Sequence, residues 1–205
     1  MTRMPSLVLL DLMGTLVREP FYRDVPEFFG MSLRELLSIK HPTSWLEFEN
    51  GAIDEETFLR SFFADGRDFD RAGLVEHMRA AYAYLPGAEA LLADLKSAGV
   101  RLAILSNYPV WYRMIDERLR YSRFVERGYY SCELGVRKPN PEIYAQVLDD
   151  VGLPAEELLF VDDRPENCAG AEKLGMRTLH FTDVPDLRAE LTRRELLRAD
   201  AAGDA

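Results

Sequence analysis

Residues 8–16 read Val-Leu-Leu-Asp-Leu-Met-Gly-Thr-Leu, an apolar run that ends on a single carboxylate. The run from Leu7 to Leu10 shows no polar alternation, which is typical of a strand buried on both faces of a parallel sheet. Asp11 follows at once, so we expect its side chain at the carboxyl end of this strand. The stretch therefore predicts both a buried strand and the position of a reactive carboxylate.

The rest of the chain repeats this strand and separates the copies by helices. Three further apolar runs have the same character: 101–105, 158–161 and 178–181. Each follows a helical stretch that opens near proline and closes at glycine, the usual punctuation of a helix: Pro86 to Gly99, Pro141 to Gly152, and Pro165 to Gly175. This alternation predicts an α/β fold with a doubly wound parallel sheet.

Between the first strand and the second, the strand pattern disappears. Four stretches of residues 17–85 look helical: 24–40, 45–49, 54–64 and 70–84. We interpret residues 17–85 as a small helical cap subdomain inserted into a core domain made of 1–16 and 86–205. Such a cap would cover the carboxyl edge of the sheet.

Composition limits the class of protein and its partners. The 205 residues are 47% hydrophobic and 29% charged, which suits one globular domain. The net charge of −10 repels polyanions, so we expect no nucleic-acid partner. The run Leu7–Leu10 is too short for a signal peptide or a membrane span, and Cys132 and Cys168 lack zinc-like spacing. We predict a cytoplasmic monomer or dimer that does not bind membranes.

Polar residues come at the ends of three predicted strands, where doubly wound sheets bind their ligands. They are Asp11, the pair Ser106-Asn107 and the pair Asp162-Asp163. A loop adds Lys138 before Pro139. Covalent phosphoryl transfer needs a nucleophile, a cation, hydrogen-bond donors and anionic ligands for Mg²⁺. These segments together supply each requirement.

In order and spacing, the segments resemble the four motifs of the haloacid dehalogenase superfamily. The resemblance covers essentially the whole chain, and residues 17–85 match the small helical cap of that superfamily. It implies a Rossmann-like core and a Mg²⁺-dependent phosphatase that hydrolyses a small phosphorylated metabolite through an aspartyl-phosphate. It also implies that Asp11 is the nucleophile and that Lys138 balances charge. The implied substrate contacts are Thr15, Ser106 and Asn107, and the implied Mg²⁺ ligands are Asp11, the Met13 carbonyl, Asp162 and Asp163.

Met13 departs from the pattern of the superfamily phosphatases, which carry an Asp general acid/base two residues after the nucleophile. Such a group is worth about 10²- to 10⁴-fold in rate, and a thioether cannot replace it. Three functions stay open: a phosphatase with its acid/base from water or from a side chain such as His41 or Glu19, a metal-independent haloacid dehalogenase, or an impaired phosphate-binding protein. The adjacent pair Asp162-Asp163 favours Mg²⁺ and phosphate, because two such carboxylates repel unless a cation separates them.

Three stretches also resemble the flavin mononucleotide (FMN) phosphatases of plant plastids: 20–31, 106–112 and 161–167. The resemblance implies that Met13 is a trait of that group and that FMN is the first candidate substrate. Aromatic residues flank the predicted mouth of the site, and a flat isoalloxazine ring could stack on one or two of them. They are Phe21, Tyr22, Phe28, Phe29, Trp45, Phe48, Tyr108, Trp111 and Tyr112.

Overall fold

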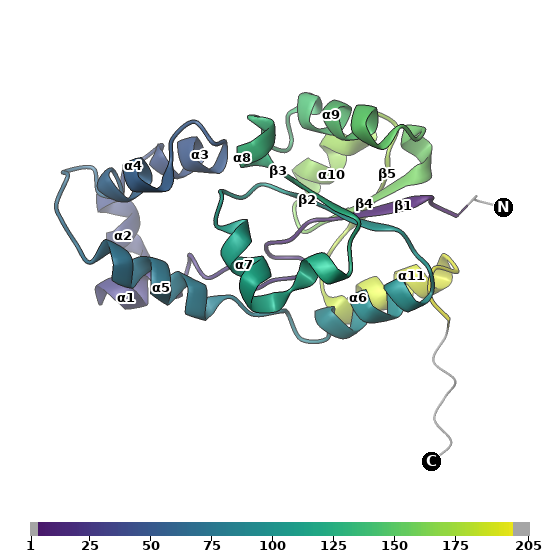
Figure 1. Ribbon diagram of the computed structural model, residues 1–205, viewed down its shortest axis with the longest axis horizontal. Helices are drawn as coiled ribbons and strands as arrows, with labels where there is room; N and C mark the ends of the chain where they lie inside the picture. Colours follow the sequence, from purple (N-terminus) through teal and green to yellow (C-terminus); the bar gives the residue numbers. More distant parts are fainter. Residues whose placement is uncertain (1–3, 199–205) are drawn as a thin grey trace, which may run out of the picture.

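A computed structural model describes residues 4–198; the outermost residues of the predicted core domain, 1–3 and 199–205, lie outside this range. Within the described residues, five parallel strands form one sheet in the order β3-β2-β1-β4-β5 (Figure 1). The strands are β1 (Leu7–Leu10), β2 (Leu102–Ser106), β3 (Arg127–Tyr130), β4 (Leu158–Asp162) and β5 (Arg177–His180). The predicted α/β fold with a doubly wound parallel sheet is confirmed.

Helices cover both faces of the sheet (Figure 1). Leu7 and Leu9 point into one apolar layer, and Val8 and Leu10 point into the other, as the period of two in a strand requires. The first layer lies under α8 (Ser131–Leu134), α9 (Pro141–Val151) and α10 (Pro165–Glu172). The second lies under α6 (Ala88–Ser97), α7 (Tyr112–Leu119) and α11 (Val184–Arg193). Short 3-10 helices, η1 (Tyr121–Arg123) and η2 (Ala155–Glu157), precede β3 and β4.

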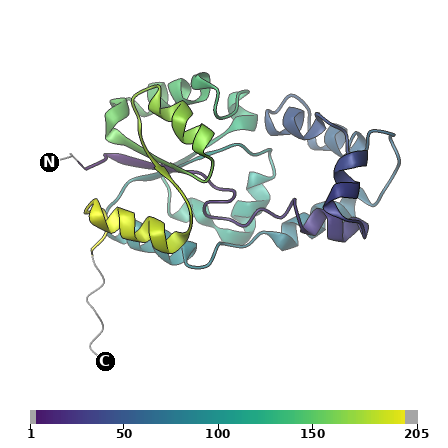
Figure 2. The same ribbon diagram turned by 180° about the vertical axis from the view of Figure 1, so that it is seen from behind.

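The first five helices after β1 lie beyond one end of the sheet, and the view from behind shows the same separation (Figure 2). They are α1 (Asp24–Phe29), α2 (Leu33–Ile39), α3 (Ser44–Glu49), α4 (Glu55–Arg60) and α5 (Arg71–Ala81). Their buried aromatic side chains continue the apolar layer of α6 and α7 without a break. No helix among residues 4–198 has the length and apolar character needed to cross a bilayer.

Strand β3 and the first helix of the cap differ from the sequence prediction, which also contained no helices at α7, α8 and α11. Strand β3 was not predicted, because its sequence Arg-Gly-Tyr-Tyr is not an apolar run; as an edge strand it is buried only toward its end. The helix predicted over 24–40 is two helices. Gly30 ends α1 in the left-handed conformation at φ 65°, and Ser32 begins α2 in a reciprocal capping box with Glu35.

Candidate active site

The chemistry of the sheet edge centres on one buried ammonium group. Lys138 Nζ donates to Asp11 Oδ1 at 2.7 Å, to Asp162 Oδ2 at 2.6 Å and to the carbonyl of Leu105 at 2.7 Å. The parallel register of β1 between β2 and β4 brings these groups together. Lys138 is 1% exposed and Asp11 is 5% exposed. The cation therefore sits in a low-dielectric site where its interactions with both carboxylates are strong.

Burial and charge shift the protonation of this group of residues. Burial raises the pKa of Asp11 to about 7, and the neighbouring Lys138 opposes the shift. Burial lowers the pKa of Lys138, but Asp11 and Asp162 outweigh it and leave the pKa raised. Lys138 therefore stays charged at neutral pH. A cation bound on the open side of Asp11 would lower the pKa of that carboxyl and favour the nucleophilic carboxylate.

The adjacent aspartates Asp162 and Asp163 have different environments. Asp162 is fully buried, and its oxygens accept hydrogen bonds from Lys138, from the Arg164 N–H and from the Asn167 amide. No side chain within residues 4–198 donates a hydrogen bond to the half-buried Asp163 carboxylate. Burial and the charge of Asp162 raise the pKa of Asp163. Asp162 thus holds Lys138, whereas Asp163 is available to a ligand.

The loop after Asp11 folds back on itself. Gly14 has φ 84°, a left-handed conformation in which other residues are strained, and its N–H donates to the Val17 carbonyl. A β-bridge places Met13 beside Val17. A Cβ atom at Gly14 would lie 2.7 Å from an Asp163 oxygen, so only glycine lets the loop approach this carboxylate. The turn therefore brings the Met13 backbone and Asp163 to one place.

The three residues predicted to contact phosphate all lie at the site but differ in their hydrogen bonding. Thr15 Oγ1 donates to Asp11 Oδ2 at 3.2 Å. The Ser106 hydroxyl is buried at the end of β2 without a hydrogen-bond partner in the described part of the chain. Asn107 bonds the Lys138 backbone through both polar atoms, at 2.8 and 2.9 Å. Asn107 thus positions the Lys138 loop, and contact of Asn107 with substrate stays a prediction.

A cavity of about 150 Å³ lies over Asp11, between the sheet edge and the cap. The sheet edge contributes Asp11, Met13, Asn107, Tyr108, Arg137, Lys138, Asp163, Arg164 and Asn167. The linker and the cap contribute Glu19, Phe21, Tyr22, Lys40, Trp45 and Glu49. The wall is therefore both aromatic and charged, as a site for a flat anion would be.

Glu49 connects the cap to the core. This buried carboxylate accepts from Arg137 Nε at 2.6 Å and from Trp45 Nε1 at 2.9 Å, and its carbonyl accepts from the Ser131 hydroxyl at 2.6 Å. Both carboxylate oxygens of Glu49 are thereby occupied. The contact fixes the indole of Trp45 at the pocket and holds α3 against the loop that carries Lys138.

Four of the nine aromatic residues predicted at the mouth line the cavity: Phe21, Tyr22, Trp45 and Tyr108. The other five pack elsewhere, because the cap must fill a core of its own. They are Phe28, Phe29, Phe48, Trp111 and Tyr112. Tyr22 is 56% exposed and is the accessible ring at the mouth.

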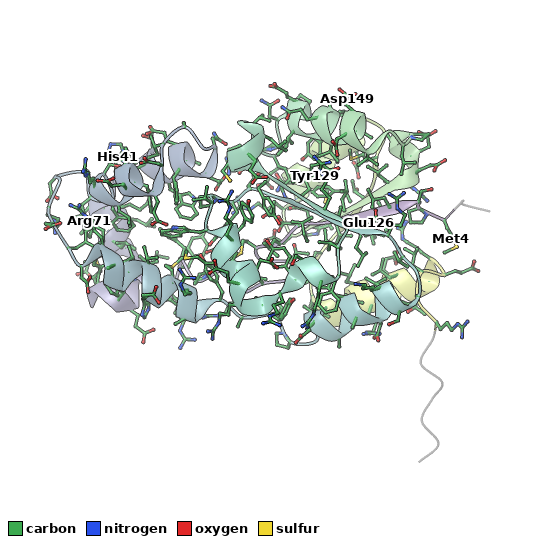
Figure 3. The ribbon with its side chains drawn as sticks, viewed as in Figure 1. Met4, His41, Arg71, Glu126, Tyr129 and Asp149 are labelled. Carbon is green, nitrogen blue, oxygen red and sulfur yellow. The ribbon has the colours of Figure 1, made fainter. Side chains whose placement is uncertain are left out.

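His41 does not supply the missing proton donor. It lies in the connection from α2 to α3, where Figure 3 labels it in the cap, and it is not part of the cavity wall. Its backbone N–H donates to the Phe62 carbonyl at 2.8 Å, and its ring Nδ1 accepts from the Ser44 backbone N–H at 3.1 Å. These bonds give His41 a structural role at the start of α3.

Magnesium suits the donor set that faces the cavity. No three acidic, histidine or thiol side chains in residues 4–198 converge into a metal site by themselves. Mg²⁺ commonly binds proteins through one or two carboxylates and completes its shell with water and substrate phosphate. Asp11 and Asp163 line the same cavity and offer such oxygens, with the Met13 carbonyl beside them. The residues present therefore fit a partly hydrated Mg²⁺ ion.

Sequence reasoning missed several residues of the wall: Lys40, Glu49, Arg137 and Arg164. Arg137 and Arg164 are each next to a predicted site residue, which is a signal that could have found them. Lys40 and Glu49 come from the cap, where the packing of helices decides the direction of a side chain. Asn167 orients the loop after β4 through its bonds to Asp162.

Residues 5–175 match the family of haloacid dehalogenase-like hydrolases. The chain belongs to this family. This hydrolase is 45% identical over 186 residues to flavin mononucleotide hydrolase 1 of Arabidopsis thaliana. The match covers 91% of this chain and 76% of the relative. The chain is 36% identical over 119 residues to (S)-2-haloacid dehalogenase 4A of Burkholderia cepacia, a match that covers 55% of this chain and 50% of the relative.

The fold of the hydrolase is also found among solved structures. A haloacid dehalogenase family enzyme of Bacteroides thetaiotaomicron, crystallised with magnesium and inorganic phosphate, superposes with a TM-score of 0.72 at 22% identity. The superposition covers 87% of this chain and 95% of that enzyme. At this identity the likeness supports the fold.

Proposed function

We propose that this haloacid dehalogenase-like hydrolase is a Mg²⁺-dependent phosphatase with FMN as its substrate. The observation that carries the proposal is the buried Asp11–Lys138–Asp162 cluster beneath a cavity with aromatic walls. The similarity to the Arabidopsis FMN hydrolase over most of both chains supports the choice of substrate. A flavin has a flat ring for the aromatic wall and a phosphate for the cationic floor.

Asp11 is the proposed nucleophile because its Oδ2 faces the Thr15 hydroxyl and not the ammonium group. Lys138 fixes the other oxygen and stabilises negative charge as the phosphoryl group transfers. The orphaned Ser106 hydroxyl is a donor for a phosphoryl oxygen. Asp163, Asp11 and the Met13 carbonyl would hold Mg²⁺, and Asp162 would position Lys138. When bound, Mg²⁺ supplies further neutralisation of the phosphoryl oxygens.

The cap side of the cavity suits the flavin. Phe21 and Trp45 contact each other with ring centroids 6.0 Å apart and an angle of 39° between their planes. A ring cannot enter between them, so it would lie against their outer surface toward Tyr22. Lys40 of the cap and Arg164 of the sheet edge add positive charge to the cavity. These groups would recognise an anion with an aromatic body.

Two other functions make different predictions. A haloacid dehalogenase would release halide from a 2-haloacid in the presence of chelator. An impaired binding protein would bind FMN without turnover. The Asp163 carboxylate beside Gly14 favours the phosphatase, because a metal-independent reaction has no use for a second acidic group there.

The proposal is tested with purified protein, FMN and Mg²⁺. We expect phosphate release that stops with chelator, and acid quenching should trap phosphate on the wild type. Asp11→Asn should lower turnover about 10⁴-fold or more and abolish the trapped phosphate. Asp149→Asn, at an exposed aspartate on α9 (Figure 3), is the matched control and should behave as wild type. Turnover that survives Asp11→Asn would contradict the mechanism.

We also propose a cytoplasmic location, a monomeric or dimeric state, and a division into a core of residues 1–16 and 86–205 with a cap of 17–85. The mass of the purified protein in solution, by light scattering, and the cell fraction that contains it would test the first two. Limited proteolysis should cut first near residues 17 and 85 if the division is right.

A further inference from the structure

We propose that Glu19 is the general acid and base that replaces the carboxylic acid absent at Met13. The inference rests on the proposed phosphatase function and adds to it a catalytic residue outside the four sequence motifs. It is carried by the position of Glu19 in the cavity that also contains Asp11 and Met13, and by the free oxygen of the Glu19 side chain.

The chain after Asp11 brings position 19 to the same cavity as position 13. Gly14 allows a tight turn at φ 84°, and a parallel β-bridge then sets Val17 beside Met13 with both segments running in the same direction. Glu19 follows two residues later, and its side chain lines the cavity together with Asp11 and Met13.

Glu19 has one oxygen held and one oxygen free. Its Oε1 accepts from the Phe21 N–H at 2.9 Å, which orients the carboxyl group. No group among residues 4–198 forms a hydrogen bond with Oε2. Every other carboxylate in the wall is committed: Asp11 to Lys138, Glu49 to Arg137 and Trp45, and Asp163 to the proposed metal site. Glu19 is thus the carboxyl group that remains for proton transfer.

The surroundings of Glu19 favour the protonated form that a general acid needs. Burial raises its pKa, the Phe21 N–H and the positive charge of Arg164 oppose the shift, and the negative charges of Glu49 and Asp163 add to it. These groups come from the cap and from the loop after β4, which are the two elements that enclose the side chain. A carboxyl group with a raised pKa can both give and take a proton during the reaction.

Glu19 moves one proton in each of two steps, phosphoryl transfer to Asp11 and hydrolysis of the phospho-enzyme. Asp11 Oδ2 forms a bond to phosphorus, the ester P–O bond breaks, and its electron pair stays on the leaving oxygen, which takes the proton of Glu19. The alcohol leaves, and Glu19 is now a carboxylate. In the second step Glu19 takes a proton from water as the water oxygen bonds to phosphorus. The bond to Asp11 breaks with its electron pair returning to Asp11, and inorganic phosphate departs.

The experiment compares leaving groups in Glu19→Gln. The ribityl alcohol of FMN needs a proton to leave, whereas p-nitrophenolate does not. We expect Glu19→Gln to lower kcat/KM for FMN about 10²- to 10⁴-fold, with a much smaller loss of kcat/KM for p-nitrophenyl phosphate. Without its base the variant should also hydrolyse the phospho-enzyme slowly. It should therefore release one nitrophenolate per active site in a burst, with phosphate trapped by acid.

Controls separate this role from binding or folding. Glu27→Gln, at an exposed glutamate on α1, should keep wild-type kinetics. Glu19→Asp keeps the acid on a shorter side chain and should retain part of the activity on FMN. Met13→Asp combined with Glu19→Gln puts a carboxyl group at the position usual in the superfamily and should restore turnover of FMN.

Distinct results would overturn the proposal. An increase of KM alone, or an equal loss for both esters without a burst, would make Glu19 a binding or structural residue. If Asp11→Asn kept its activity, or if no phosphomonoester were hydrolysed, the proposed function would fail and this inference with it. If alkyl phosphates other than FMN were hydrolysed, the comparison with p-nitrophenyl phosphate would still decide the role of Glu19.

Discussion

The two walls of the cavity hold their charged groups in different ways. On the core wall, Lys138 and Asp162 are buried and bonded to one another, to backbone and to Asn167. On the cap wall, the Lys40 ammonium donates to no group of residues 4–198 except the adjacent His41 carbonyl, at 3.1 Å, and Glu19 has one free oxygen, although Glu49 is bonded to Arg137. Removing a partner from the core wall leaves an uncompensated buried charge, which is costly. Substitutions in the buried cluster around Lys138 are therefore expected to cost more stability than substitutions of Lys40 or Glu19.

Among the four variants that test this comparison, the largest expected effect is at the centre of the core wall. Lys138→Met leaves Asp11 and Asp162 buried without their cation. We expect a loss of about 10²- to 10³-fold in kcat and of about 3 to 5 kcal/mol in the free energy of unfolding. Phosphate-release kinetics and urea denaturation measure the two. Lys173→Met, at an exposed position after α10, is the control. A stable and active variant would remove the distinction between the walls.

The second variant tests whether the residue that donates to Asp162 contributes to activity. Asn167→Ala removes the amide that donates to both oxygens of Asp162, at 2.9 and 3.1 Å. Loss of a partner that orients a site of this kind costs about 10- to 100-fold in activity. We expect this loss in kcat with little change in KM. A change confined to KM would show that Asn167, which also lines the cavity, acts on the substrate.

A smaller effect is expected where the two walls meet. Glu49→Leu removes the acceptor of Arg137 and Trp45, so the indole loses its fixed position. A hydrogen bond to a charged group is worth about 1.5 to 3 kcal/mol, which corresponds to a rise of about tenfold or more in KM for FMN. For p-nitrophenyl phosphate, which has no flavin ring, KM should change less. Equal changes for both substrates would argue against recognition of the ring by the cap.

The smallest effect is expected from a substitution in the outer part of the cap. Ser32→Ala breaks the capping box at the start of α2, remote from the cavity wall. We expect a loss of about 1 kcal/mol in the free energy of unfolding and unchanged kcat/KM for FMN. Thermal denaturation and steady-state kinetics check both. A loss of activity would mean that the outer helices control the cavity.

The core wall could be predicted from sequence far better than the cap wall. Asp11, Ser106 and Asp162 end buried apolar strands, and the parallel sheet must bring strand ends to one edge. Lys138 was predicted from its motif and from the order of the motifs along the chain. Strand β3 was missed because an edge strand with one buried end carries no continuous apolar run.

The cap wall depends on information that local sequence does not contain. Phe21 and Phe28 are equally apolar, yet one lines the cavity and the other packs against Phe29 and His77. The direction of each ring follows from the packing of α1 to α5 against one another. The division of Asp162 and Asp163 was likewise hidden, because it follows from Asn167 and the approach of Gly14.

The presence of Glu19 in the same cavity as Met13 has a consequence for how such proteins are classified. A column-by-column comparison would find thioether in place of acid and would mark this protein as inactive. If Glu19 acts as proposed, a residue six positions after Met13 supplies the acid that position 13 lacks. Other members that lack the acid can be searched for a carboxyl group elsewhere in the cavity wall before they are set aside as non-enzymes.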